Sequence, residues 1–273
     1  MSDTQAKKGQ GWRIASKIYL VLVMIFLYAP VAIMIRYSFN NSRANVSWMG
    51  FTTKWYVRLF SDGSLWQIFF VTLFVAVMVT LIGTIVGTMG AVGMNKAKFI
   101  GHKFITSAIY FPIVIPEIVL AVSLLLLFNF QGMPLGIPTI IIGNTTLVLP
   151  YVYITVKARL VGMDPSIEEA SLDLGADRFY TFMHITMPAI LPGVLAGAFM
   201  SFSLVLDELI MTSFLADAAT VTLPMKVYSM IKKGVNPEIN ALTTIIFLAA
   251  GLFVVLYLVV DEIHQRSMTK KRK

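Results

Sequence analysis

Long stretches of uncharged, mostly apolar residues constrain this chain more than any other feature of its sequence. A helix of about 20 apolar residues crosses the roughly 30 Å hydrocarbon core of a bilayer. The sequence therefore predicts an all-α, polytopic membrane protein with six transmembrane helices, at residues 18–35, 65–94, 104–130, 139–156, 189–206 (or as far as 215) and 241–260. The third of these stretches, at 104–130, is interrupted by Pro112, Pro116 and Glu117.

Composition supports lipid as the solvent of this chain. Of its 273 residues 57% are hydrophobic and 13% are charged, which is too little polar surface for a soluble globule of this size. The net charge of +8 lies in short segments between apolar runs, so we interpret it as membrane-flanking charge and do not expect nucleic acid as a partner. The absence of cysteine excludes a disulfide scaffold, a thiolate nucleophile and a zinc–thiolate site.

The distribution of lysine and arginine predicts the orientation of the spans. Fifteen of the 22 basic residues fall on the side that carries both termini, and seven fall on the other side. Cytoplasmic segments are the more basic ones, so both termini are expected in the cytoplasm. The expected organisation is a cytoplasmic tail at 1–17, a transmembrane domain at 18–260 and a basic cytoplasmic tail at 261–273.

The cytoplasmic loop at 157–188 is too structured to be a simple connector. Asp164 can cap a helix that has Pro165 in its first position, and Gly175 can end that helix in the left-handed conformation. Asp177 can cap a second short helix, which ends where Pro188 opens the fifth span. Periodicity alone leaves two interpretations open: an amphipathic connector on the membrane surface, or a docking element for another protein.

The spacing of residues in this loop favours docking. Glu169, Ala170 and Ser171 are followed after three residues by Gly175, after nine more by Ile185, and then by Met187 and Pro188. This pattern resembles the E-A-A, x3, G, x9, I-x-L-P signature of the permease subunits of binding-protein-dependent ABC importers, with serine and methionine as the two departures. The resemblance implies a type I importer permease whose first loop helix couples to an ATPase through Glu169, Ala170, Ser171, Gly175, Ile185 and Pro188.

Other segments resemble the permeases of spermidine and putrescine importers. They are Y-A-P at 28–30, Y-S-F-N at 37–40, S-L-V-L-D-E at 203–208 and G-V-N-P-E-I-N-A at 234–241. The resemblance implies a bacterial cell-membrane protein with three kinds of protein partner: ATPase subunits, a second and homologous permease, and an extracytoplasmic polyamine-binding protein. It also suggests that Asn236, Pro237 and Glu238 contact that binding protein.

Three acidic residues fall inside predicted spans, where ionisable groups are costly unless they are paired or hydrated. Glu117, Asp207 and Glu208 are all placed in the outer half of the membrane. They could attract a polyammonium substrate, with Tyr110 and Phe111 adding cation–π contacts. The alternative is structural: Glu117 follows Pro116 and could cap a broken helix, and the other two could mark the end of the fifth span.

The sequence also bears on two other functional classes. An enzyme is disfavoured because the three histidines fall at cytoplasmic edges and neither an H-E-x-x-H nor a G-x-S-x-G pattern is present. A Walker A sequence is also absent, so no cofactor is expected in this chain and ATP with magnesium would be bound by the partner ATPase. An ion-coupled secondary transporter of organic cations stays open as the alternative, and the source of energy distinguishes it from an importer subunit.

Overall fold

The structure is a computed structural model that describes residues 2–42, 47–96, 99–234, 237–249 and 251–252, with side chains described from residue 16 onward. Most of the described residues are helical and none is in a strand; two of them, Asn40 and Phe51, form an isolated β-bridge. The chain forms two compact units. We call Ser64–Tyr228 the central unit, and Met1–Gly63 together with Ser229–Lys273 the terminal unit.

Glycines allow the long helices of the central unit to approach closely. These helices are α3 (Gly63–Lys96), α6 (Ile137–Val161) and α9 (Met187–Asp207). On α3, a Cβ atom at Gly83 would lie 2.9 Å from Val148, and one at Gly87 would lie 2.7 Å from Val152. Small residues four positions apart are typical of tightly packed membrane helices, so α3 packs on one side of α6 through a glycine stripe.

Glycines on α9 also allow that helix to approach α6 closely. A Cβ atom at Gly193 would lie 2.8 Å from the backbone oxygen of Thr155, and one at Gly197 would lie 2.7 Å from the hydroxyl of Thr155. Because the α6 backbone itself occupies the space, neither helix could move closer or accept a side chain here without shifting. Helix α6 is therefore held between two glycine-bearing neighbours.

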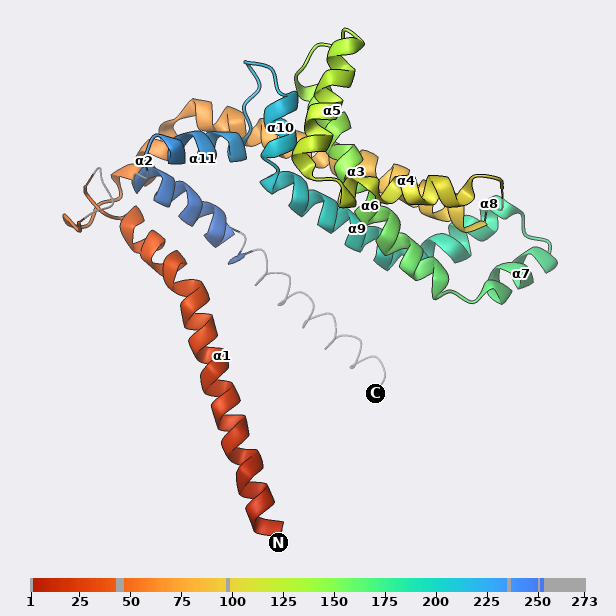
Figure 1. Cartoon of the computed structure of the whole chain (residues 1–273), viewed down its shortest axis with the longest axis horizontal. Helices are drawn as coiled ribbons and strands as arrows, with labels where there is room; N and C mark the ends of the chain where they lie inside the picture. The colour runs from red at the N-terminus through yellow and green to blue at the C-terminus, as the bar shows by residue number, and fades with distance from the viewer. Residues whose placement is uncertain (1, 43–46, 97–98, 235–236, 250, 253–273) are drawn as a thin grey trace. The chain divides into compact units, whose positions relative to one another are not determined.

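The third predicted span is broken. It consists of α4 (His102–Val114) and α5 (Glu117–Phe130), whose axes differ in direction by 111°. Ile115 and Pro116 between them have extended backbone angles, and proline cannot continue a helical hydrogen-bond ladder. The sharp turn between α4 and α5 is plain in Figure 1.

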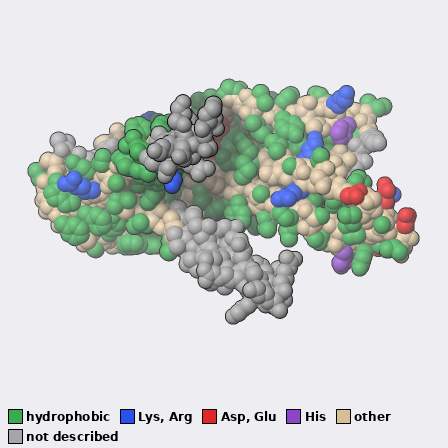
Figure 2. All heavy atoms as spheres, turned by 90° about the horizontal axis from the view of Figure 1, so that it is seen from below, with side chains coloured by type: hydrophobic (Ala, Val, Ile, Leu, Met, Phe, Trp, Pro, Cys, Tyr) green, Lys and Arg blue, Asp and Glu red, His purple; other side chains and the backbone are tan. Residues whose placement is uncertain are grey.

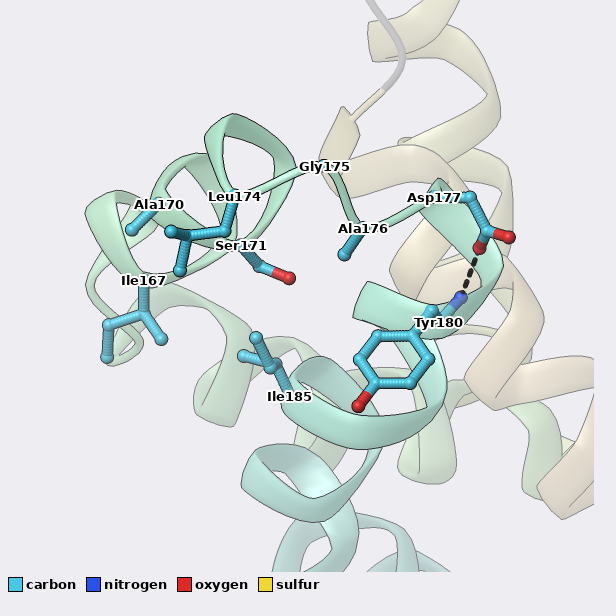
Figure 3. A pocket seen from close by; sticks show the side chains of 9 residues that line it. All are labelled: Ile167, Ala170, Ser171, Leu174, Gly175, Ala176, Asp177, Tyr180 and Ile185. Carbon is cyan, nitrogen blue, oxygen red and sulfur yellow. Dashed lines mark hydrogen bonds between the residues drawn. The ribbon is translucent and has the colours of Figure 1, made fainter.

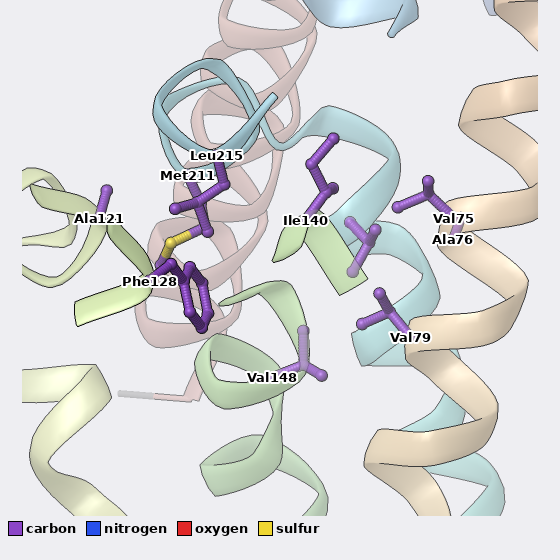
Figure 4. Close-up of a cluster of buried hydrophobic side chains, with 10 residues drawn as sticks. Val75, Ala76, Val79, Ala121, Phe128, Ile140, Val148, Met211 and Leu215 are labelled. Atoms are coloured by element: carbon purple, nitrogen blue, oxygen red, sulfur yellow. The ribbon is translucent and has the colours of Figure 1, made fainter. Parts of the chain in front are cut away.

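The fifth predicted span is also broken, near its outer end. Helix α9 ends at Asp207, and the short helix α10 (Ile210–Leu215) follows after Glu208 and Leu209. The optional extension of this span to residue 215 is thus a separate helix. Figure 4 shows Met211 and Leu215 of α10 packed with Ala121 and Phe128 of α5 in a cluster that also includes Ile140 and Val148 of α6 and Val75, Ala76 and Val79 of α3.

The loop between the fourth and fifth spans contains α7 (Pro165–Asp173) and α8 (Arg178–Thr181). Helix α8 continues without a break through a π-helical turn, Phe182–Thr186, into α9. The second loop helix and the fifth predicted span therefore form one helix that runs from Arg178 to Asp207. A π-turn lengthens the helical hydrogen bond by one residue, here from Met187 N–H to the carbonyl of Phe182.

The terminal unit contains α1 (Ser2–Ser38), α2 (Lys54–Ser61) and an apolar helix at Pro237–Ala249. A further helix, α11 (Leu223–Lys232), crosses from the central unit into it. The residues after α1 are held by Asn40, whose side chain is fully buried and bonds to the backbone of Ser47 and Met49 at 2.7 and 2.8 Å.

Among the described residues, four helices are long and apolar enough to cross a membrane, at Ser16–Ser38, Gly63–Asn95, Ile137–Val161 and Arg178–Asp207. They match the first, second, fourth and fifth predicted spans, and α4 with α5 accounts for the third. Residues 250 and 253–260 of the sixth predicted span and all of the tail at 261–273 lie outside the described residues. Hydrophobic side chains cover much of the face seen in Figure 2, as expected of a surface in lipid.

Candidate functional site

The ends of α7 are defined by the residues that the sequence indicated. The Asp164 side chain accepts a hydrogen bond from the backbone N–H of Ser166 at 3.0 Å, with Pro165 opening the helix. Hydrogen bonds from the Ser166 backbone and side chain hold the pKa of the Asp164 carboxyl below its usual range. At the other end Gly175 has φ +90°, a left-handed conformation that glycine adopts without strain.

The residues around Gly175 form a complete Schellman motif. Its N–H donates to the carbonyl of Leu172 at 2.9 Å, and the N–H of Ala176 donates to the carbonyl of Ser171 at 3.1 Å. The chain then turns into α8, where Asp177 accepts the backbone N–H of Tyr180 at 2.6 Å. Both expected caps and the glycine stop are confirmed.

One side of α7 and the start of α8 border a shallow depression of about 660 Å³. Figure 3 shows the side chains of Ile167, Ala170, Leu174, Tyr180 and Ile185 around it. Leu174 is 89% exposed, and Glu169, Ala170 and Gly175 are exposed as well. An apolar depression with an exposed leucine at its edge is the kind of surface that another protein covers.

Two of the residues in the signature lie away from the exposed surface of α7. Ser171 is buried, with 8% of its surface exposed, and its hydroxyl lies 3.0 Å from that of Thr181. Pro188 is exposed in the first turn of α9. Sequence reasoning missed Glu168 and Thr186, whose side chains are hydrogen-bonded to each other; no motif marks them.

A second candidate site lies where the two broken spans meet. Glu117, Asp207 and Glu208 line one cavity of about 450 Å³, together with residues at 203–204 and 209–210. Glu117 is the first residue of α5, and Glu208 follows the last residue of α9. The structure thus brings Glu117 together with Asp207 and Glu208, which come about 90 positions later in the chain.

The two glutamates of this cavity have different surroundings. Glu208 is 7% exposed, and its Oε1 accepts the backbone N–H of Met211 at 2.7 Å, which ties it to the first turn of α10. The Oε1 atom of Glu117 is buried and has no hydrogen-bond partner among the described residues. A buried acceptor without a donor is costly, so Glu117 is the group here that a ligand's donor would satisfy best.

The aromatic candidates do not line this cavity. Tyr110 packs its ring edge-on against Tyr153 of α6, with centroids 5.9 Å apart, in the core cluster between α6 and α9. Phe111 is 52% exposed on α4. Both precede the break at Ile115 and Pro116.

The candidate contacts for a binding protein lie in the terminal unit. Asn236 lies outside the described residues. Pro237 is buried, and the carboxyl of Glu238 is paired with Arg58 of α2 at 3.8 Å and is mostly covered, with 16% of the side chain exposed. This placement favours a structural contribution from Pro237 and Glu238.

Comparison with known proteins identifies the family. Residues 81–270 match the family described as binding-protein-dependent transport system inner membrane component. The chain is 38% identical to the spermidine/putrescine transport system permease protein PotC of Escherichia coli K12, over 87% of this chain and 90% of the relative. It is 37% identical to the putrescine transport system permease protein PotI of the same organism, over 93% of each chain.

The fold agrees with that assignment. A chain of a bacterial ABC transporter involved in the import of the acidic polysaccharide alginate superposes with a TM-score of 0.73 at 17% identity, over 94% of this chain and 96% of that chain. At this identity the likeness shows the fold alone. With the sequence signature in place at α7 and most of the chain matched, this protein belongs to the family of binding-protein-dependent transport system inner membrane components.

Proposed function

We propose that this chain is a permease subunit of an ATP-driven importer of polyamines and that the substrate passes the cavity lined by Glu117, Asp207 and Glu208. The observation that carries this proposal is the convergence of three acidic side chains at the breaks of two spans. Spermidine and putrescine are polycations, and carboxylates in a medium of low dielectric constant attract them strongly. The printed substrates of the relatives PotC and PotI support the same substrate class.

The position of this cavity suits a transport path. Ionisable residues within spans are costly and are retained mainly where they serve function, and broken helices form substrate sites in many transporters. Tyr110 and Phe111 stand on α4 before the break and are proposed as cation–π partners for an ammonium group along the path. Because the cavity is small and its polar groups are few, we propose that the length of the polyamine is read by the protein that delivers it.

The proposed energy source is a separate ATPase that docks on α7. The exposed Glu169, Ala170 and Gly175 and the depression beside them form the proposed contact. Ile185 borders that depression, and Pro188 begins the helix that leads from it into the span. ATP and magnesium are bound by that partner in this proposal, and this chain contributes no cofactor site.

The proposed complex has two further proteins: a second, homologous permease in the membrane and an extracytoplasmic polyamine-binding protein. The loop at 157–188 and both termini lie in the cytoplasm, and the boundaries at 17 and 261 mark the two tails. This orientation is supported by the 15 basic residues on one side against seven on the other. Because Pro237 is buried and Glu238 is paired with Arg58, Asn236 is the first of the three candidates that we propose as a contact for the binding protein.

Uptake of radiolabelled spermidine and putrescine tests the proposal. Membrane vesicles containing this chain with the proteins encoded beside it are loaded with ATP or left without it, and the ion gradient is collapsed in parallel samples. We expect uptake that depends on ATP and on the partner proteins and that survives collapse of the gradient. Gradient-driven uptake by this chain alone would instead establish an ion-coupled transporter of organic cations.

A further inference from the structure

Helix α7 is fastened to the base of the fifth span by two side-chain hydrogen bonds. The hydroxyls of Ser171 and Thr181 lie 3.0 Å apart, and the hydroxyl of Thr186 donates to the Oε1 atom of Glu168. Thr181 is 3% exposed and Thr186 is fully buried. Both bonds therefore lie in the interior between α7 and the helix that becomes α9.

The π-turn explains why both bonds can form at once. Glu168 and Ser171 are three positions apart on α7 and so lie on one face of that helix. Thr181 and Thr186 are five positions apart, which in a regular α-helix would separate their directions by about 140°. The π-turn at Phe182–Thr186 has more residues per turn, which brings the two threonines back to the same side.

Helix α7 relies on these neighbours for its position. Its main contacts are with α8 and the π-turn, and α7 and α8 are separated only by the short Schellman turn after Leu174. Hydrogen bonds in a buried environment are directional, and leaving one partner of a buried pair unsatisfied is costly. The two bonds thus fix the orientation of α7 against the helix that enters the membrane.

We infer that Glu168 and Thr186 are positioning residues for energy coupling: their bond makes α7 and the base of α9 move as one rigid body. This inference rests on the proposed docking of an ATPase at α7. Force applied to the exposed face of α7 reaches α9 through the Glu168–Thr186 and Ser171–Thr181 bonds. Without them α7 could tilt on its loop while α9 stayed in place, so that ATP would be hydrolysed without transport.

The test measures the number of polyamine molecules transported per ATP hydrolysed, in proteoliposomes that contain the complete transporter. Thr186→Val keeps the shape of the side chain and removes its hydroxyl, and Glu168→Leu removes the acceptor. Thr186→Ser and Glu168→Gln each keep a hydrogen bond. The matched control is Thr146→Val, because the Thr146 hydroxyl donates an exposed hydrogen bond to the carbonyl of Ile142 within its own helix, at 2.9 Å.

We expect Thr186→Val and Glu168→Leu to assemble with the ATPase in normal yield, to retain ATP hydrolysis, and to lose roughly tenfold in transport per ATP. The double variant should lose no more than either single variant, since both remove the same bond. Thr186→Ser, Glu168→Gln and Thr146→Val should behave like the unmodified protein.

Unchanged transport per ATP in Thr186→Val would overturn the inference, and so would losses that multiply in the double variant. Failure of the underlying docking proposal has a different signature. In that case Gly175→Asp, in the exposed turn that ends α7, would leave ATPase association and transport intact whatever the result at Thr186.

Discussion

The hydroxyl groups of Ser171 and Thr181 face each other at 3.0 Å in the interior of the cytoplasmic loop. Ser171 stands where the family signature has alanine, and the substitution looks neutral when only the sequence is considered. In the structure it is one half of a polar contact between α7 and α8. The departure from the signature is therefore matched by a hydroxyl on the neighbouring helix.

Substitution of Gly175 should loosen the end of α7. Its φ of +90° is disfavoured for any residue with a Cβ atom, although no atom lies within 4 Å of where that Cβ would be. Gly175→Asp is expected to cost about 1 kcal/mol in local stability and to uncouple transport, while insertion in the membrane is unchanged. Uptake and ATPase association measure the effect. Gly162→Ala is the control, because Gly162 has φ −84° and room for a methyl group.

Glu169→Lys tests the exposed face of α7 directly. Glu169 is exposed and belongs to the proposed contact surface, so reversing its charge should weaken ATPase binding without unfolding α7. The expected result is reduced co-purification of the ATPase and reduced uptake. Asp173→Lys, which makes the same charge reversal in the last turn of the same helix, serves as the matched control. Equal behaviour of the two variants would contradict a specific role for Glu169.

Neutralising the acidic cavity should impair transport more than assembly. Glu208→Gln keeps an oxygen that can accept the N–H of Met211, so α10 should stay in place while the negative charge is lost. Asp207→Asn and Glu117→Gln are equally conservative in shape. We expect reduced polyamine uptake in each variant and the largest loss when all three are combined, measured beside the yield of assembled complex. Normal uptake by the triple variant would remove the cavity from the transport path.

A methyl group at Gly193 should destabilise the central unit. It would lie 2.8 Å from the backbone oxygen of Thr155 and 2.7 Å from Cγ of Arg159, and the backbone cannot easily move away. Overpacking of this kind typically costs about 1–3 kcal/mol. Thermal unfolding of purified Gly193→Ala in detergent should show a lowered midpoint. Gly93→Ala, where no atom lies within 4 Å, should unfold like the parent protein.

A charge swap can distinguish a structural ion pair between Arg58 and Glu238 from direct contact of these residues with the binding protein. The Arg58 side chain is 68% exposed, so the pair should contribute less than about 1 kcal/mol to stability. The charge swap Arg58→Glu with Glu238→Arg preserves an ion pair and reverses the surface charges. We expect uptake to survive the swap. Uptake lost in the swap, with stability unchanged, would point to direct recognition of these charges by the binding protein.

Much of the architecture follows from the sequence because the transfer of a helix into lipid depends on that helix alone. Five of the six predicted spans correspond to helices or a bent helix pair at the expected places. The caps at Asp164 and Asp177 and the stop at Gly175 were predictable for a similar reason. They depend on hydrogen bonds within a few residues of each other.

What the sequence alone determined is thus the local chemistry: apolar spans, charge on their flanks, helix caps and a spaced signature in one loop. Only the tertiary structure decided which polar groups meet. Glu117 and Glu208 share a cavity because two spans break at the same level, and Glu168 reaches Thr186 because a π-turn shifts the register of one helix. These contacts between side chains of different helices depend on how several helices pack. Hydropathy or residue spacing along one helix carries no information about them.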